Sequence, residues 1–305
     1  MAEITASLVK ELREKTGAGM MECKKALTET NGNLEEAIDW LRKKGLSVAA
    51  KKAGRIANQG LVAVVTDNNA GVALELNSET DFVAKNEEFQ NFVKDISQIA
   101  LETKGDMDAL KNADYKGKTV ETALTELIAK IGENMTLRRV AYTEAEGVVV
   151  PYVHSAVTAG LGKIGVLVAL NSTADKAVLA DLGKKIAMHI AAAAPQFLTV
   201  DAVDSSVLEH EKSIFAEQAR ASGKPEAIIE KMVEGRIRKF YEESVLLEQA
   251  FVMEPDKKVK DIIADAAKAA GTDIAIKEFI RYNLGEGLAK KEENFAEEVN
   301  KQLGK

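Results

Sequence analysis

The chain is poor in the residues that staple small secreted proteins or fill aromatic cores. Cys23 is the only cysteine among 305 residues, so no internal disulfide can form, as is usual for proteins of a reducing cytoplasm. Aromatic residues make up only 5% of the chain, and we therefore expect cores of Ala, Val, Ile and Leu. With only four prolines and long stretches rich in Ala, Glu and Lys, the composition favours helices.

An excess of positive charge is also missing. The formal net charge is -7, whereas a protein whose main task is to grip phosphate backbones usually carries a basic excess. No apolar run approaches the length of a membrane span, and the opening "MAEITASLVKELREK" is too charged for the apolar core of a secretory signal. We therefore expect a cytoplasmic protein that binds neither nucleic acid directly nor membranes.

The sequence lacks catalytic and metal-binding patterns as well. The three histidines, His154, His189 and His210, do not stand at metal-ligand spacing from Cys23 or from one another. No serine occupies a nucleophile elbow, and no histidine stands near Cys23 in the sequence. We therefore expect no metal, no cofactor and no catalytic residue, and we expect His189, in the apolar "AMHIA", to be a hydrogen-bonded core residue.

One short glycine-rich motif could be either a nucleotide-binding motif or a hairpin loop. "GLGKIG", Gly160 to Gly165, matches the G-x-G-x-x-G pattern of dinucleotide-binding proteins, in which a helix N-terminus behind the glycines holds the pyrophosphate. Here the segment behind is "IGVLVAL", a strand pattern, and Lys163 is followed by Ile164 rather than by the Ser or Thr of a phosphate-binding loop. The motif therefore indicates a glycine-rich hairpin loop and not a nucleotide site.

The N-terminal region has the periodicity of a small helical unit. Apolar residues at helical spacing predict three short helices between residues 3 and 45, with "TGAGM" between the first two. Asn33 is placed to cap the third helix, and Gly45 is expected to end it. The next stretch, "SVAAKKAGRIANQG", is interpreted as a linker. Such a unit serves either as a docking module or as a structural cap, and the pattern leaves both open.

Beyond residue 60 the pattern indicates two α+β subdomains of related build. In each, a strand hairpin leads into helices, and Leu76-Asn77-Ser78 and Leu170-Asn171-Ser172 stand at the same strand-to-helix join, which suggests a duplication. Late in the chain, "KEFIRYNLGEG" echoes "LRRVAYTEAEG". Strands are expected at 60–66, 71–78, 136–143, 147–154 and 163–172, and helices at 121–135, 176–194 and around a face of Phe89, Phe92, Val93, Ile96 and Ile99.

A charged helical insertion divides the second subdomain. Gly223 and Pro225 mark a tight turn between two helical segments, which predicts an antiparallel coiled-coil hairpin over 200–243. The predicted fold class is therefore α+β with antiparallel sheets. The expected parts are an N-terminal three-helix bundle with linker at 1–54, a first subdomain at 55–145, a second subdomain with a C-terminal module at 146–199 and 244–305, and the inserted hairpin.

The stretch "SETDFVAKNEEF", residues 78–89, raises the question of where Phe82 points. Phe82 stands seven positions before Phe89, and this spacing alone favours a place on the same buried helix face. Two observations oppose that interpretation: Lys85 and Asn86 interrupt the face, and the corresponding "STADKAVLADL" has no aromatic near its start. An aromatic residue on an exposed helix start suits a wedge that enters a pocket of a partner.

The same stretch carries a family resemblance. "TDFVAKN" resembles the signature of the bacterial elongation factor Ts family, and so does "LVKELREKTGAGMMECKKAL" near the N-terminus. The segments "KIGVLVAL", "KKIAMHIAA", "KPEAIIEKMVEGRI", "FVMEP" and "FIRYNLGEG" continue the resemblance in the order of the family, over essentially the whole chain. One departure is "HSAVTAGLGKIG", which is expected to form a longer loop than in some members.

The resemblance implies a guanine nucleotide exchange factor. Such a protein binds elongation factor Tu with GDP or without nucleotide, and promotes GDP release so that GTP can bind. The resemblance further implies that Phe82 wedges into the nucleotide domain of Tu and disturbs its magnesium and phosphate site. Thr80, Asp81 and Val83 would shape that segment. The N-terminal module would dock on the same domain through Lys10, Arg13, Met20 and Met21, and His154 would contact another domain of Tu.

Two rival functions are kept beside this one. A docking or chaperone-like protein would bind Tu without faster nucleotide release. An enzyme that used the "GLGKIG" loop would bind a nucleotide by itself.

Overall fold

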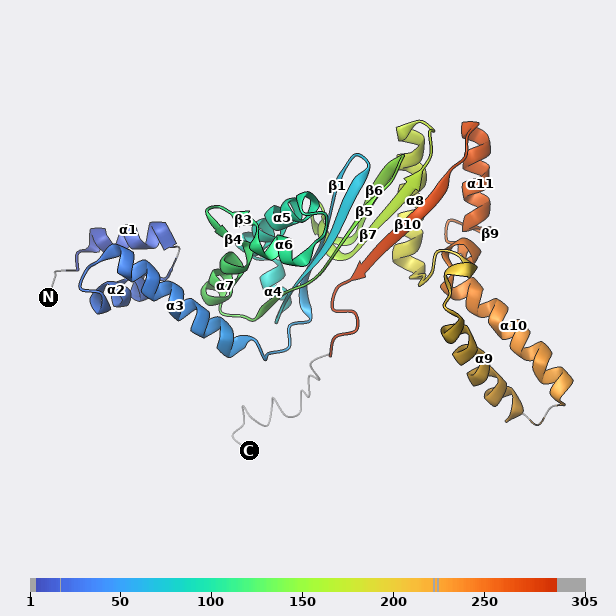
Figure 1. Ribbon diagram of the computed structural model, residues 1–305, viewed down its shortest axis with the longest axis horizontal. Helices are drawn as coiled ribbons and strands as arrows, with labels where there is room; N and C mark the ends of the chain where they lie inside the picture. The colour runs from blue at the N-terminus through green and yellow to red at the C-terminus, as the bar shows by residue number, and fades with distance from the viewer. Residues whose placement is uncertain (1–3, 17, 222, 224, 290–305) are drawn as a thin grey trace. The chain divides into compact units, whose positions relative to one another are not determined.

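The computed structural model describes residues 4–16, 18–221, 223 and 225–289, which belong to two compact units (Figure 1). Unit 1 comprises Met1–Val62, Leu74–Arg139 and Leu284–Lys305, and unit 2 comprises Ala63–Ala73 and Val140–Asn283. The strands at 148–158 and 275–283 both pair antiparallel with the strand at 161–171, and the N-terminal elements are helices. The predicted α+β class with N-terminal helices and antiparallel sheets is confirmed.

The three predicted N-terminal helices are α1 (Ala6–Thr16), α2 (Met20–Glu29) and α3 (Leu34–Lys52). They share a small core in which Leu12, Cys23 and Leu27 are fully buried. Asn33 caps α3 as expected, because its Oδ1 accepts hydrogen bonds from the backbone N–H groups of Glu35 and Glu36 at 3.1 and 3.2 Å.

The predicted end of the third helix is wrong. Gly45 lies inside α3, which continues to Lys52 through the first half of the expected linker. The cause is tertiary: α3 packs on α7 (Val120–Ile131), and a Cβ on Gly45 would lie 3.6 Å from the Cβ of Ala129. Lys52 also donates a hydrogen bond to the backbone oxygen of Gly132, just behind α7. These contacts offset the roughly 1 kcal/mol by which glycine disfavours a helix interior.

The predicted hairpin comprises β1 (Gln59–Asp67) and β2 (Ala70–Ser78); it starts and ends in unit 1, and Ala63–Ala73 belong to unit 2. β2 is followed in the sheet by β5 (Met135–Glu144). Of the expected helix face on α5 (Glu87–Glu102), Phe89, Phe92, Val93 and Ile96 are buried and Ile99 is half-buried. Gly132, in the left-handed conformation with φ 86°, ends α7. The sequence analysis did not anticipate α4 (Asp81–Ala84), α6 (Met107–Asn112), β3 (Asp114–Tyr115) and β4 (Lys118–Thr119).

Unit 2 is built on β7 (Leu161–Asn171), which pairs antiparallel with β6 (Val148–Thr158) and β10 (Ala275–Asn283). Inward-facing Val166, Val168 and Leu170 pack with residues of α8 (Lys176–Ala193), the helix predicted at 176–194. This cluster is the larger core of the unit.

The prediction of a longer loop after His154 is wrong. β6 runs on to Thr158, and only Ala159 and Gly160 lie between it and β7. The strands pair this closely because of Gly162, where a Cβ would lie 2.5 Å from Cγ1 of Val153. The glycines of "GLGKIG" therefore serve a hairpin, as predicted, and a strand stands where a dinucleotide motif needs a helix.

The insertion in unit 2 contains α9 (Ser205–Arg220) and α10 (Glu226–Ser244), which pack on each other (Figure 1). Its base is closed where Phe197 forms a parallel bridge with Val245 and accepts a 2.8 Å hydrogen bond from the N–H of Leu246. The short 3-10 turns are η1 (Val200–Ala202) and η2 (Leu246–Glu248). For the expected C-terminal module, the sequence analysis predicted no separate elements. The structure shows β8 (Ala250–Phe251), β9 (Glu254–Lys258) and α11 (Val259–Ala270) there.

His189 is the hydrogen-bonded core residue that the sequence predicts. Its side chain is fully buried on α8, and its Nδ1 accepts a hydrogen bond from the N–H of Val252 at 3.2 Å. Its Nε2 therefore carries the proton and donates to Oε1 of Gln249 at 2.8 Å. Burial lowers the pKa of His189 below its ordinary value, so the neutral ring is the folded form.

Candidate functional site

Phe82 and Phe89 lie on different helices. α4 is a single turn, Asp81–Ala84, and Lys85 and Asn86 separate it from α5. Asn86 starts α5, since its side chain accepts a hydrogen bond from the N–H of Phe89 at 3.1 Å. The buried face of α5 therefore begins at Phe89, and the seven-residue spacing does not place Phe82 on it.

Phe82 points out of the protein. Its side chain is 75% exposed, whereas its neighbours Val83 and Ala84 are 4% and 7% exposed. Burying a phenylalanine stabilises a fold by about 1.5–3 kcal/mol, and the fold leaves that gain unused here. The expectation that Phe82 faces outward is confirmed, and Val83, one of the predicted site residues, is an inward anchor of the segment.

Two charged residues flank the exposed ring. The Nζ of Lys85 lies 5.6 Å from the centroid of the Phe82 ring and 3.6 Å from Oδ2 of Asp81. Asp81 and Lys85 are both exposed. The apolar ring is thus bordered by an ion pair and remains open to a partner.

The start of the segment is fixed by a carboxylate from the end of α7. The N–H of Thr80 donates to Oε2 of Glu133 at 3.0 Å, and the Thr80 hydroxyl donates to Oε1 at 2.7 Å. The backbone oxygen of Thr80 accepts from the hydroxyl of Ser78 at 2.9 Å. Sequence reasoning missed Glu133, because no local pattern marks a residue that acts 53 positions away.

A buried carboxylate close to this region has a structural role. Glu75 on β2 is fully buried and pairs with Arg138 at 3.1 Å and Arg139 at 2.6 Å. Burial by itself would raise the pKa of Glu75, but hydrogen bonds from the N–H of Gly285, from Asn77 and from Arg139 together lower it. The group is a fully bonded anion that holds the segment at Gly285 and offers no proton for catalysis.

The predicted N-terminal contact residues are accessible. Lys10 and Arg13 are exposed on α1, and Met20 and Met21, at the start of α2, are 55% and 76% exposed. Two exposed methionines in a row form an adaptable apolar surface of the kind that partners use. The structure places all four residues on α1 and α2 of unit 1.

His154 lies on β6 of unit 2, opposite Ile164. Its side chain is exposed, and its Nδ1 is 3.3 Å from the hydroxyl of Tyr152. The residue that follows, Ser155, has a positive φ of 52°, so the strand bends beside the histidine.

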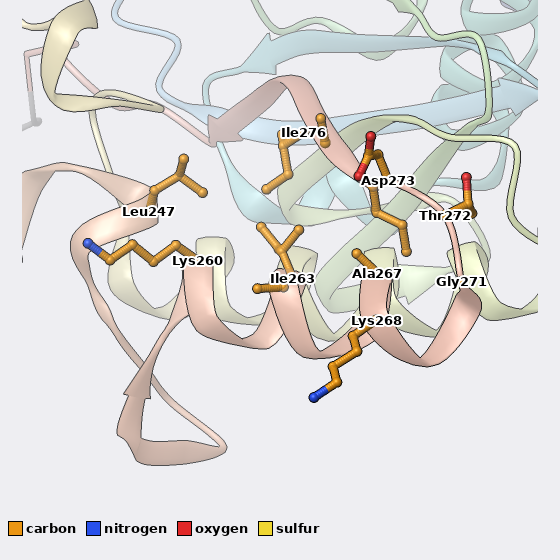
Figure 2. A pocket seen from close by; sticks show the side chains of 12 residues that line it. Leu247, Lys260, Ile263, Ala267, Lys268, Gly271, Thr272, Asp273 and Ile276 are labelled. Carbon is orange, nitrogen blue, oxygen red and sulfur yellow. The ribbon is translucent and has the colours of Figure 1, made fainter.

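A groove of unit 2 lies between α11 and the start of β10 and has a volume of about 710 Å³ (Figure 2). Ile263 and Ile276 point toward each other across it, and Lys268 extends away from it. Its lining is mainly apolar and contains no serine, cysteine or histidine; its polar side chains are Lys260, Lys268, Thr272 and Asp273.

Within the described ranges, no cluster of three or more His, Cys, Asp or Glu residues could hold a metal ion. The helices found between residues 4 and 289 include none that is long and apolar enough to cross a membrane.

Comparison with known proteins gives full-length matches. The family model described as elongation factor TS matches residues 79–286, well over half of the chain. The elongation factor Ts of Rhodospirillum rubrum is 59% identical over 309 residues, which cover 100% of both chains. That of Maricaulis maris is 57% identical and 98% of each chain is covered; that of Caulobacter vibrioides is 56% identical, with 100% of this chain and 99% of the relative covered.

Proposed function

Because the chain belongs to the elongation factor Ts family, we propose that it inserts Phe82 into the nucleotide domain of elongation factor Tu and disturbs the magnesium and phosphate site there. The protein is a guanine nucleotide exchange factor for Tu in translation elongation and not an enzyme. Its place of action is the bacterial cytoplasm, where elongation occurs. What we propose is the place on Tu where the protein acts.

One observation carries this proposal: an aromatic side chain is 75% exposed on a backbone segment that is fixed on both sides. Val83 and Ala84 hold the segment by burial, and Thr80 holds it by two hydrogen bonds to Glu133. A preformed segment loses little conformational entropy on contact, so that more of the contact energy remains for the partner.

The free-energy requirement of exchange fits such a wedge. An exchange factor must bind empty Tu more tightly than Tu with GDP, and the coupling is reciprocal, so each ligand weakens the other by the same factor. Magnesium and the phosphate-binding backbone hold GDP largely by charge. A ring that displaces those groups removes contacts from GDP and makes its own. A hot-spot residue contributes about 2–4 kcal/mol, and every 1.4 kcal/mol corresponds to about a tenfold rate.

The N-terminal helices are proposed to dock on the same domain of Tu. The exposed Lys10, Arg13, Met20 and Met21 support this role, since neither the methionines nor the basic side chains are used in the core of the three helices. Since α3 packs on α7, the proposed docking module is also a packing partner within unit 1. His154, exposed on β6, is proposed to contact another domain of Tu.

We also propose that the fold contains two related α+β subdomains. In support, Leu76-Asn77-Ser78 closes β2 and Leu170-Asn171-Ser172 stands at the end of β7, and each triplet precedes a helical segment. The proposed parts are 1–54, 55–145, 146–199 with 244–305, and a coiled-coil hairpin at 200–243. The two compact units divide the chain differently, because the tip of the first hairpin belongs to unit 2 and the segment from Leu284 belongs to unit 1.

The test is the release of a fluorescent GDP analogue from Tu, followed with increasing amounts of this protein. We expect a saturable acceleration. Variants of Lys10, Arg13, Met20 and Met21 should raise the concentration needed for half-maximal acceleration, whereas variants of Phe82 should lower the maximal rate. Binding to Tu without any acceleration would contradict the proposal and favour a mere docking protein.

A further inference from the structure

We infer that Glu133 is a positioning residue for nucleotide exchange: its carboxylate holds Thr80 and thereby sets the direction in which Phe82 leaves the protein. The inference rests on the proposed function of Phe82. The evidence is the pair of hydrogen bonds, 3.0 Å from the Thr80 N–H and 2.7 Å from the Thr80 hydroxyl, that end on the two oxygens of one carboxylate.

The segment needs such a constraint. α4 has four residues, fewer than a helix needs to be stable by itself, because nucleation of the first turn is unfavourable. Phe82 makes little packing of its own and cannot orient the turn. Burial of Val83 and Ala84 fixes one face, and the Gln90 side chain donates to the backbone oxygen of Ala84 at 2.9 Å. On the Thr80 side, the Ser78 hydroxyl donates to the backbone oxygen of Thr80, and the Glu133 carboxylate accepts from both the N–H and the hydroxyl of Thr80.

Glu133 itself stands between two fixed neighbours. Gly132, before it, has a left-handed backbone and accepts a hydrogen bond from Lys52 at the end of α3. Asn134, after it, is 5% exposed and donates from its side chain to the backbone oxygen of Arg55 at 2.8 Å. The N–H of Asn134 donates to Glu79 at 2.6 Å. Lys52 and Arg55 therefore hold the loop 132–134 from outside the segment, and Glu79, next to Thr80, adds a second link between loop and segment.

Three substitutions separate positioning from charge. Glu133→Ala removes both acceptors. Glu133→Gln preserves the pairing, because its amide carbonyl accepts from the Thr80 N–H and its NH₂ group donates to the Thr80 hydroxyl oxygen. Thr80→Val removes the hydroxyl and keeps the backbone bond. Glu102→Gln, at an exposed carboxylate at the end of α5, is the control for the loss of one negative charge.

The measurement is stimulated GDP release from Tu at several concentrations of the full-length variants. We expect Glu133→Ala to lower the maximal rate about three- to tenfold, the range of one or two lost hydrogen bonds, with the half-maximal concentration within about twofold. Glu133→Gln and Glu102→Gln should stay within about twofold of the parent, and Thr80→Val should lose about two- to threefold. Hydrogen exchange of the peptide around 79–85 should be faster in Glu133→Ala than in the parent.

A second background tests whether Glu133 acts through Phe82. In Phe82→Ala, the additional Glu133→Ala change should alter the maximal rate by less than about twofold, since coupled residues are not additive. Equal losses in both backgrounds, or a Glu133→Ala variant with the parent rate, would overturn the inference. If Glu133→Ala does not fold, Thr80→Val is measured instead, alone and combined with Phe82→Ala. Equal losses of the maximal rate in the two cases would again overturn the inference. A Phe82→Ala variant with the parent rate would instead overturn the proposed function itself.

Discussion

Lys85 holds its ammonium group over the ring of Phe82, with Nζ 5.6 Å from the ring centroid. The same ammonium lies 3.6 Å from the carboxylate of Asp81, one helical turn earlier. All three side chains are exposed. An exposed cation–π contact contributes about 0.5–1 kcal/mol and an exposed ion pair about as little. The pair therefore restrains the ring without burying it, and leaves one face available to a partner.

Replacement of Lys85 by methionine tests how much this restraint matters. Lys85→Met should change the free energy of unfolding by less than about 1 kcal/mol and lower the maximal rate of GDP release about twofold. Urea unfolding and stopped-flow GDP release measure the two quantities, with Lys184→Met, at an exposed lysine of α8, as the control for charge. A loss as large as that of Phe82→Ala would mean that the cation, and not the ring, acts on Tu.

Two helical glycines predict opposite effects of the same substitution. A Cβ on Gly45 would lie 3.6 Å from the Cβ of Ala129, an ordinary contact, so Gly45→Ala should raise the free energy of unfolding by up to about 1 kcal/mol. A Cβ on Gly183 would lie 2.4 Å from Cγ2 of Val150, so Gly183→Ala should lower it by about 1–3 kcal/mol. Urea unfolding followed by circular dichroism decides; destabilisation by Gly45→Ala would contradict the packing of α3 on α7.

Local patterns predicted those elements whose signal lies within a few residues. The Asn33 cap, the hairpin of β1 and β2 and the buried face of α5 follow from capping chemistry and periodicity. The polar break at Lys85 and Asn86, the missing aromatic in the second half and the family signature together predicted that Phe82 lies outside.

Features set by distant contacts could not be predicted in this way. Gly45 looks like a helix end, and only the packing of α3 on α7 explains why it is not. The hold of Glu133 on Thr80 joins positions that are 53 residues apart. In the C-terminal part, Val259 and Ile263 stand at helical spacing and are buried, but the packing of α11 on α8 depends on the whole unit.

Stability should depend on pH through His189. Burial lowers its pKa in the folded protein, so the unfolded chain binds this proton more readily. The contribution to stability is therefore complete above the unfolded pKa of about 6.5 and is lost as pH falls toward the lower folded pKa, by at most about 1.4 kcal/mol per pH unit. Urea unfolding between pH 7 and pH 5 measures the slope.

The matched variants are His189→Gln and His210→Gln, the latter at an exposed histidine of α9. His189→Gln should reduce the loss of stability on acidification, and His210→Gln should retain it. An unchanged slope in His189→Gln would show that other groups cause the pH dependence.

The hairpin of α9 and α10 should be dispensable for exchange on isolated Tu. Its base is closed by Phe197 and Val245, so both arms can be shortened by equal numbers of turns without separating the chain ends. We expect an unchanged far-ultraviolet spectrum, apart from the lost helix, and GDP release within about twofold of the parent. A large loss of exchange in a folded shortened variant would show that the hairpin contacts the active complex.

The most direct test of the central claim is Phe82→Ala, measured on one preparation by urea unfolding and by stopped-flow release of fluorescent GDP from Tu. Because the side chain is 75% exposed, the free energy of unfolding should change by less than about 1 kcal/mol, well below the 3–5 kcal/mol of a core phenylalanine. The maximal rate of GDP release should fall about tenfold or more, as expected for a lost hot spot. A collapse of stability, with normal exchange by the fraction that remains folded, would contradict the claim.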